Sequence, residues 1–379
     1  MPGHILKNKT LLLSFILFVM CGTVYGQKST PEINNLIKAI DQSYIKGNIE
    51  KKRFLELTAD LYYSSKKAKY IPGQTFSIFE QTRLYYFEGN FALSLKKINE
   101  GIALAKSEKD YDMLCRLLLM YQSSLLKLDF VNQAQHILAK CEEYNEYNTS
   151  KENKRINDIF IDLAKADLLV DTKGLSDDLK TVISLKKEAY STALKLNDSN
   201  KYKKITIIYS LESLAWSVAL SENTKEARKY TAELDKLLEG YPNAYSIIQS
   251  FIIKGAIENI DRNYKQAISH FSQAVALSKK YKSIYNLYEV YPMISAAYGE
   301  SKDFENATLY SWKFKHLSDS LIEVKKKSDN IDLINQINQK ISEKEEPGNW
   351  FNDVKIPILI VVSVLAAGGF LWYRRFKKE

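Results

Sequence analysis

A pattern of apolar and small residues that recurs about every 40 positions constrains the fold of this chain more than any other feature. Its clearest copy lies at 251–281, where apolar residues three and four positions apart mark one face of each of two helices, with a turn at 261–263 between them. Ala227, Ala267 and Ala307 repeat the pattern at equal intervals. Because such a helical hairpin buries its apolar face only against its neighbours, the pattern predicts a helical solenoid.

The 251–281 unit resembles the tetratricopeptide repeat (TPR) family. The matching small and large positions are Gly255, Tyr264, Ala267, Phe271 and Ala274, whereas Phe251 replaces the family's first-helix Trp, Glu258 replaces a large residue, and the closing Pro is absent. The family repeats at about 34 residues, so a period near 40 predicts longer helices. The resemblance implies an all-α, TPR-like α-solenoid of about seven helical hairpins within residues 27–325.

Two parts of the repeat region depart from the regular spacing. The interval from Ala134 to Ala227 exceeds two periods by about 13 positions, and we expect the excess around 169–181 as a longer loop or an extended hairpin. After the last repeat, a narrow apolar stripe lies in the segment 326–346 and predicts either a helix that caps the last hairpin or a short coiled-coil stalk. The stripe consists of Ile331, Leu333, Ile334, Ile337 and Ile341.

The N-terminal segment 1–26 has the pattern of a secretory signal peptide. Lys7 and Lys9 precede a short apolar run, and small residues at Val24 and Gly26 come before Gln27. Two alternatives stay open. One is a retained membrane anchor, and the other is a lipoprotein acylated at Cys21, which has an ill-suited Met20 before it.

A second apolar segment, 356–373, predicts a transmembrane helix. Its 18 residues carry no charge and would span about 27 Å as a helix, close to the thickness of about 30 Å of a bilayer core. A linker at 347–355 precedes it, and a basic tail at 374–379 follows it. The positive-inside rule then predicts a single-pass protein of the cytoplasmic (inner) membrane, with residues 27–354 periplasmic or otherwise extracytoplasmic and the C-terminus cytoplasmic.

Charge and motifs argue against two function classes. The flanks at Lys7, Lys9, Lys355 and 374–379 carry +6 of the formal +9, which leaves +3 for residues 27–354, too little to indicate nucleic-acid binding. The sequence has no HExxH, CxxC pair, Gly-rich phosphate loop or GxSxG motif. It therefore predicts no catalytic residue, cofactor or metal, and a protein that is not an enzyme.

Cys115 and Cys141 allow two interpretations. They are expected at the same end of one hairpin, and an exported compartment would permit a disulfide. However, facing helices run about 8–10 Å apart, whereas a disulfide needs Cα atoms within about 7 Å. Two packed thiols are the simpler interpretation, and the disulfide stays an alternative.

TPR proteins bind protein segments, usually in the concave groove lined by the first helix of each hairpin, and the resemblance implies the same here. The implied groove residues are Phe79, Arg83, Tyr86, Glu212, Trp216 and Asn259. The architecture also resembles bacterial membrane-anchored TPR regulators, but without their cytoplasmic output domain. We therefore expect a membrane-anchored, extracytoplasmic, non-enzymatic scaffold that binds a protein or peptide.

Two alternatives to the scaffold hypothesis stay open. One is a sensory subunit of a signalling or transcription-regulatory system whose kinase or DNA-binding output lies on another chain or has been lost. Such a subunit would contact its partner through the membrane helix, where Gly368 and Gly369 permit close helix contact, or through the basic tail. The other is an enzyme or a glycan-binding module on a helical scaffold.

Overall fold

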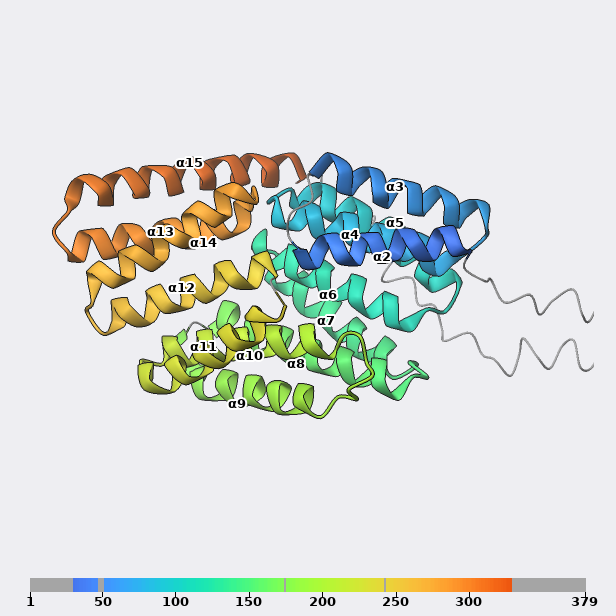
Figure 1. The fold of residues 1–379 in the computed structure, drawn as a ribbon, viewed down its shortest axis with the longest axis horizontal. Helices are drawn as coiled ribbons and strands as arrows, with labels where there is room; N and C mark the ends of the chain where they lie inside the picture. Colours follow the sequence, from blue (N-terminus) through green and yellow to red (C-terminus); the bar gives the residue numbers. More distant parts are fainter. Residues whose placement is uncertain (1–29, 47–50, 174, 242, 329–379) are drawn as a thin grey trace, which may run out of the picture. The chain divides into compact units, whose positions relative to one another are not determined.

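The computed structural model describes residues 30–46, 51–173, 175–241 and 243–328, and its helices up to Lys326 belong to one compact unit. Within these residues there are fourteen α-helices and no strand. Consecutive helices pair into seven hairpins stacked in chain order, from α2–α3 to α14–α15 (Figure 1). The helices are α2 (Pro31–Lys46), α3 (Lys51–Lys67), α4 (Ile71–Phe87), α5 (Phe91–Ser107), α6 (Tyr111–Lys127), α7 (Val131–Asn145), α8 (Lys151–Lys173), α9 (Leu175–Leu194), α10 (Lys203–Leu220), α11 (Thr224–Glu239), α12 (Ala244–Ile260), α13 (Tyr264–Lys280), α14 (Ile284–Glu300) and α15 (Phe304–Ser328).

The lengths of the helices explain the long period of the sequence. Helices α4, α5, α6, α12, α13 and α14 each have 17 residues, and a turn of three residues, such as 88–90, follows each of them. Two such helices together with their two turns account for one period. The prediction of longer helices is confirmed for these hairpins.

The three-residue turns share one backbone device. The second turn residue adopts a positive φ, at 71° in Gly89 but also at 56° in Lys109, 62° in Arg262 and 54° in Lys282. In most of these turns the N–H of the following residue donates to a carbonyl five residues back, as Asn263 does to Glu258 at 2.8 Å, which ends one helix in a Schellman motif. Apart from Gly89, the turns hold side-chain-bearing residues in a conformation that favours glycine, at a cost of about 1–2 kcal/mol each.

Gly255 permits the close approach of α12 and α13 that the sequence pattern predicts. A Cβ atom placed on Gly255 would lie 2.5 Å from two ring carbons of Phe271. Phe271 is only 1% exposed and packs against Ala267 and Ala274 within the same apolar cluster. The small residue on α12 thus makes room for the aromatic ring on α13.

The irregular spacing in the middle of the chain lengthens a hairpin and does not produce a long loop. Helix α8 has 23 residues and α9 has 20, and only Gly174, outside the described residues, separates them. The alternative of a long loop at 169–181 is therefore wrong, and the extended hairpin is observed. Helix α15 runs on to Ser328, while the rest of the segment predicted to cap the solenoid or form a stalk lies outside the described residues.

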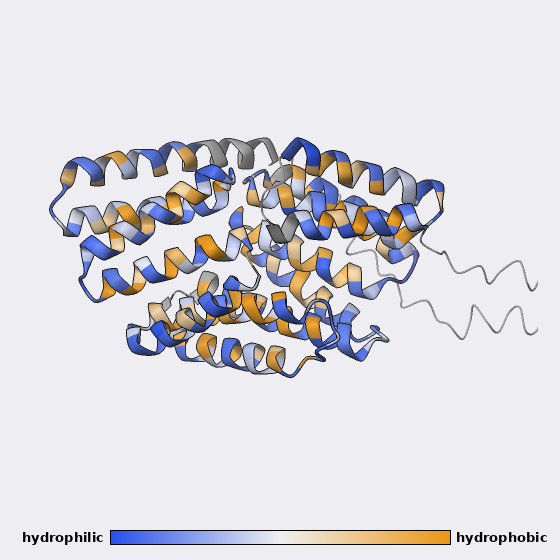
Figure 2. Cartoon of the chain, viewed as in Figure 1, coloured by the Kyte–Doolittle hydropathy of each residue, from blue (hydrophilic) through white to orange (hydrophobic). Residues whose placement is uncertain are grey.

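Two predictions need correction: the transmembrane helix at 356–373, and the single-pass location in the cytoplasmic membrane with residues 27–354 outside the cytoplasm. Among the helices that the structure describes, none is both long enough and apolar enough to cross a bilayer. The helices mix hydrophilic and hydrophobic residues along their length (Figure 2), and α10, for example, contains Lys203, Lys204 and Glu212. The segments 1–26 and 356–373 themselves lie outside the described residues, so the structure supports neither a membrane span nor the location derived from it.

The even-numbered helices form the inner layer of the solenoid. Each even-numbered helix from α4 to α12 contacts the next even-numbered one, and the odd-numbered helices pack behind them. Helix α14 also contacts α4, although the two belong to the seventh and the second hairpin. The inner layer therefore closes on itself and encloses a space between early and late repeats.

Candidate functional site

A cavity of about 890 Å³ lies inside the inner layer. Its walls come mainly from α2, α4, α6, α8, α10, α12 and α14, with Leu179 and Lys186 added from α9. The lining combines aromatic and aliphatic side chains with five acidic and five basic ones. The acidic residues are Asp41, Glu80, Asp167, Glu212 and Glu289, and the basic residues are Arg83, Arg116, Lys127, Lys186 and Lys201.

Four aromatic rings close the cavity where the early and late repeats meet. The Phe87 ring lies 4.7 Å from the Tyr245 ring, and the Tyr86 ring lies 5.4 Å from the Tyr285 ring. We call Tyr86, Phe87, Tyr245 and Tyr285 the aromatic clasp. Lys127 of α6 reinforces it, because its Nζ lies 3.5 Å from Glu289 Oε1 and 4.6 Å from the centre of the Tyr285 ring. The clasp explains how α4 and α14 come into contact.

Two glutamates lie beside the clasp in different environments. Glu289 is hydrogen-bonded, since Gln249 Nε2 donates to its Oε2 at 2.9 Å and Tyr285 donates to the carboxylate as well. Glu212 Oε2 is buried and has no hydrogen-bond partner. Burial raises the pKa of Glu212 to about 8, and the nearby charge of Glu289 adds to the rise while the Ser246 hydroxyl opposes it. At neutral pH Glu212 is therefore protonated.

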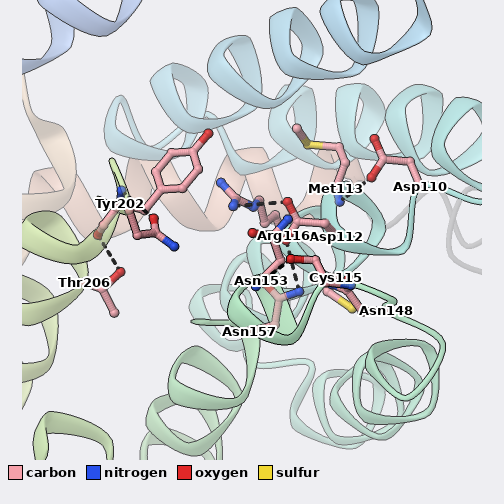
Figure 3. A network of polar contacts seen from close by, with 12 residues as sticks. Asp110, Asp112, Met113, Cys115, Arg116, Asn148, Asn153, Asn157, Tyr202 and Thr206 are labelled. Carbon is pink, nitrogen blue, oxygen red and sulfur yellow. Dashed lines mark hydrogen bonds and ion pairs between the residues drawn. The ribbon is translucent and has the colours of Figure 1, made fainter. Parts of the chain in front are cut away.

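A second polar network lies where α6, α8 and α10 begin (Figure 3). Arg116 Nη2 lies 3.1 Å from Asp112 Oδ2, and the guanidinium stacks 4.3 Å from the centre of the Tyr202 ring. Asn157 Nδ2 donates to Asp112 Oδ1 at 3.3 Å and to Asn145 Oδ1 at 3.1 Å. The network holds a largely buried guanidinium at the cavity wall and ties three hairpins together.

Further charges are held at the cavity wall in pairs. Arg83 Nη2 lies 2.6 Å from Glu80 Oε2, and Lys186 Nζ lies 2.8 Å from Asp167 Oδ1. Burial raises the pKa of Glu80, and the Arg83 charge opposes that rise. Glu80 and Lys186 are the buried members of these pairs, and each needs its partner because a buried charge without one is costly.

Buried polar atoms without partners border the space inside. Gln122 is 1% exposed and Asn157 is 0% exposed, both line the cavity, and neither Gln122 Nε2 nor Asn157 Oδ1 has a hydrogen-bond partner. Glu212 Oε2 is likewise buried without a hydrogen-bond partner. Because buried polar atoms are usually hydrogen-bonded, the wall keeps donor and acceptor capacity for a polar occupant.

Most of the groove residues expected from the sequence line this cavity. Phe79, Arg83, Tyr86, Glu212 and Trp216 do so. Asn259, in the last turn of α12, is not among the lining residues.

Many lining residues were not predicted from the sequence, among them Tyr245, Gln249, Tyr285 and Glu289. Their spacing was an available signal, because Tyr245 and Tyr285 are one period apart, and so are Gln249 and Glu289. Residues that recur with the hairpin period lie on the same face of successive inner helices.

The two cysteines of the α6–α7 hairpin are free and buried. Cys141 Sγ donates to the Cys115 carbonyl at 3.5 Å, and Cys115 Sγ lies 3.6 Å from the Cys141 carbonyl. The hydrogen bond to Cys115 and burial both raise the pKa of the Cys141 thiol, which makes it a poor nucleophile. The geometry is that of two packed thiols.

No protein-family model matches this sequence, and no curated protein does. Among solved structures, a Rap protein complexed with Competence and Sporulation Factor has a TM-score of 0.55 at 12% identity, covering 78% of this chain and 78% of that chain. The fold is a TPR-like solenoid. The apo form of RapI has a TM-score of 0.46 at 13% identity over 76% of this chain and 99% of that chain. At such low identities the likeness concerns the fold alone, and the resemblance to membrane-anchored regulators gains no support from it.

Proposed function

We propose that the protein is a non-enzymatic scaffold that binds a peptide, or a segment of a partner protein, inside the cavity of its inner layer. The observation that carries this proposal is the cavity itself, at about 890 Å³. Ligand cavities are typically about 300–1,000 Å³, mostly apolar, and carry a few polar groups that orient the ligand. An extended peptide presents both kinds of group at short intervals.

The chemistry of the wall favours a peptide over a purely apolar ligand. Peptide N–H and C=O groups would satisfy Gln122 Nε2 and Asn157 Oδ1, which have no partner in the protein. The aromatic side chains Phe79 and Trp216 offer apolar surface to side chains of the same ligand. The Rap structure named above is a complex with Competence and Sporulation Factor, and it provides a precedent for ligand binding by a solenoid of this fold.

A matched pair of serine substitutions tests the proposal. Ser213 lines the cavity, so Ser213→Trp would obstruct it, whereas the exposed Ser269 lies on the outer helix α13, so Ser269→Trp makes the same change elsewhere. Peptides would be selected from a random heptapeptide display library against the full chain and titrated calorimetrically. We expect Ser213→Trp to weaken binding by at least about tenfold and Ser269→Trp to leave it unchanged, because only the first occupies the ligand's space.

Circular dichroism would verify that both variants keep their helices. If no peptide is selected, the proposed function is wrong. If the peptides bound the folded Ser213→Trp variant as tightly as the wild type, their binding site would lie outside the cavity. The proposal that the cavity holds the ligand would then be wrong.

A further inference from the structure

The cavity contains a cage of four tyrosines around two carboxyl groups. The Tyr245 ring lies 6.4 Å from the Tyr209 ring and 6.2 Å from the Tyr285 ring, which in turn lies 5.4 Å from the Tyr86 ring. Helices α4, α10, α12 and α14 each contribute to the cage. We use the name tyrosine cage for Tyr86, Tyr209, Tyr245 and Tyr285 together with Glu212 and Glu289.

Aromatic faces and carboxylates attract the same kind of group. A cation within about 6 Å of an aromatic ring centre is attracted by the ring quadrupole, and more strongly where water is excluded. The protein itself illustrates this preference, because Lys127 places its Nζ 4.6 Å from the Tyr285 centre and 3.5 Å from Glu289 Oε1. The chain's own ammonium group thus occupies the Glu289 side of the cage.

Within the described residues, no cationic side chain pairs with Glu212 on the other side of the cage. Its Oε2 atom is buried without a hydrogen-bond partner, and the residue borders the cavity. With both glutamates ionised and Lys127 in place, the cage would carry one uncompensated negative charge. One further cation would therefore neutralise it and would also satisfy the unpartnered oxygen atom.

We propose that the tyrosine cage binds a cationic group of the peptide ligand, an ammonium or a guanidinium, against Glu212. This inference rests on the proposed function and specifies its ligand as a basic peptide. The cation comes from a lysine or arginine side chain or from the peptide's N-terminus, which share this chemistry. Lys127 remains paired with Glu289, and the ligand occupies the opposite side.

Cation binding at Glu212 requires that its carboxyl group lose a proton. The group is protonated at neutral pH in the ligand-free cavity, and an arriving cation stabilises the ionised form. Ser246 and Tyr245 from α12 and Glu289 from α14 interact with it. Tyr86 from α4, Lys127 from α6, Tyr209 from α10 and Tyr285 from α14 line the same cavity. Burial raises the pKa values of Tyr86, Tyr245 and Tyr285, so these hydroxyls stay protonated while Glu212 titrates around pH 8.

The affinity for a guanidinium peptide should therefore rise with pH. Arginine does not titrate below about pH 12, so the ligand itself contributes nothing to the pH dependence. For a carboxyl group with a pKa of about 8 that must ionise on binding, the affinity increases by about 50-fold between pH 6 and pH 8 and then levels off. Binding should also release close to one proton at pH 6.

The test uses the peptides recovered from the heptapeptide library and their neutral derivatives. In each derivative arginine becomes citrulline, lysine becomes acetyl-lysine and the N-terminus is acetylated. We expect at least a tenfold loss of affinity for the neutral derivative. In the protein, Glu212→Gln should weaken binding of the basic peptide at pH 8 and abolish the pH dependence, whereas Glu222→Gln, the same change at an exposed turn residue outside the cavity, should do neither.

The outcomes separate this inference from the proposed function. The cage proposal would be overturned if the neutral derivatives of the selected peptides bound equally well, or if the affinity for Glu212→Gln kept its pH dependence. Either result would leave the scaffold function standing. Failure to select any peptide would overturn both. Because glutamine resembles the protonated Glu212, the variant should fold as the wild type does at neutral pH, which a melting curve would establish.

Discussion

Replacing Gly255 by alanine should destabilise the solenoid even though alanine is the better helix former. In an open helix position the change would stabilise by about 0.5–1 kcal/mol. Here the new Cβ would lie 2.5 Å from two carbons of the Phe271 ring and 2.9 Å from a third. The ring is 1% exposed and belongs to a buried apolar cluster, and overpacking of this kind costs about 1–3 kcal/mol. We expect a net loss of about 1–2 kcal/mol.

Gly299→Ala is the matched control, because Gly299 also lies in the first helix of a hairpin but a Cβ atom added to it would meet no atom within 4 Å. It should stabilise by up to about 1 kcal/mol. Urea unfolding followed by circular dichroism would measure both midpoints, with the slope checked for a change in unfolding mechanism.

A double-mutant cycle identifies the cause. If the loss comes from the ring, then Gly255→Ala should cost less in a Phe271→Leu background, because leucine leaves room for the methyl group. A Gly255→Ala midpoint at or above that of the wild type would refute the close-approach argument. So would an equal loss at Gly299.

Single residues in a turn, in the cavity and in the α6–α7 hairpin allow three further tests. Lys282→Gly should raise the unfolding free energy by about 0.5–1 kcal/mol, because Lys282 holds a φ of 54° that costs glycine little; an unchanged or lower urea midpoint would contradict this. Burial raises the pKa of Glu212 from 4.5 to about 8, so its stabilising contribution is present below about pH 4.5 and is lost as the pH rises through 8. Relative to Glu212→Gln, the wild type should lose on the order of 2–4 kcal/mol of unfolding free energy between pH 5 and pH 9. If the stability of the two proteins changed with pH in parallel, the raised pKa of Glu212 would be excluded. Cys115 and Cys141 are free, so iodoacetamide in urea without reductant should modify both with carbamidomethyl groups, as seen by mass spectrometry, whereas protection of both would indicate a disulfide.

The repeat itself could be predicted from the sequence, because its cause is local. Three-residue turns and 17-residue helices impose the period, and small residues such as Gly255 mark where helices approach. The inner positions of the hairpins could be assigned from register, and Phe79 and Trp216, expected in the groove on that basis, line the cavity.

Closure of the solenoid could not be predicted in the same way. The contact between α4 and α14 depends on a twist that accumulates over several hairpins, so no short stretch of sequence encodes it. For the same reason Tyr86 was predicted as a groove residue, but its partner Tyr285 was not. Asn259, in the last turn of α12, was expected in the groove but is not among the residues that line the cavity.

Photo-cross-linking tests the central claim, that the ligand occupies the inner cavity, most directly. A library-selected peptide that carries a photoreactive phenylalanine would be irradiated with the full chain, and the linked residues would be mapped by mass spectrometry. Binding inside the cavity predicts links to lining residues of the inner helices, such as Met120, Trp216 and Met293. Links confined to the outer helices α5, α11 and α13 would contradict it.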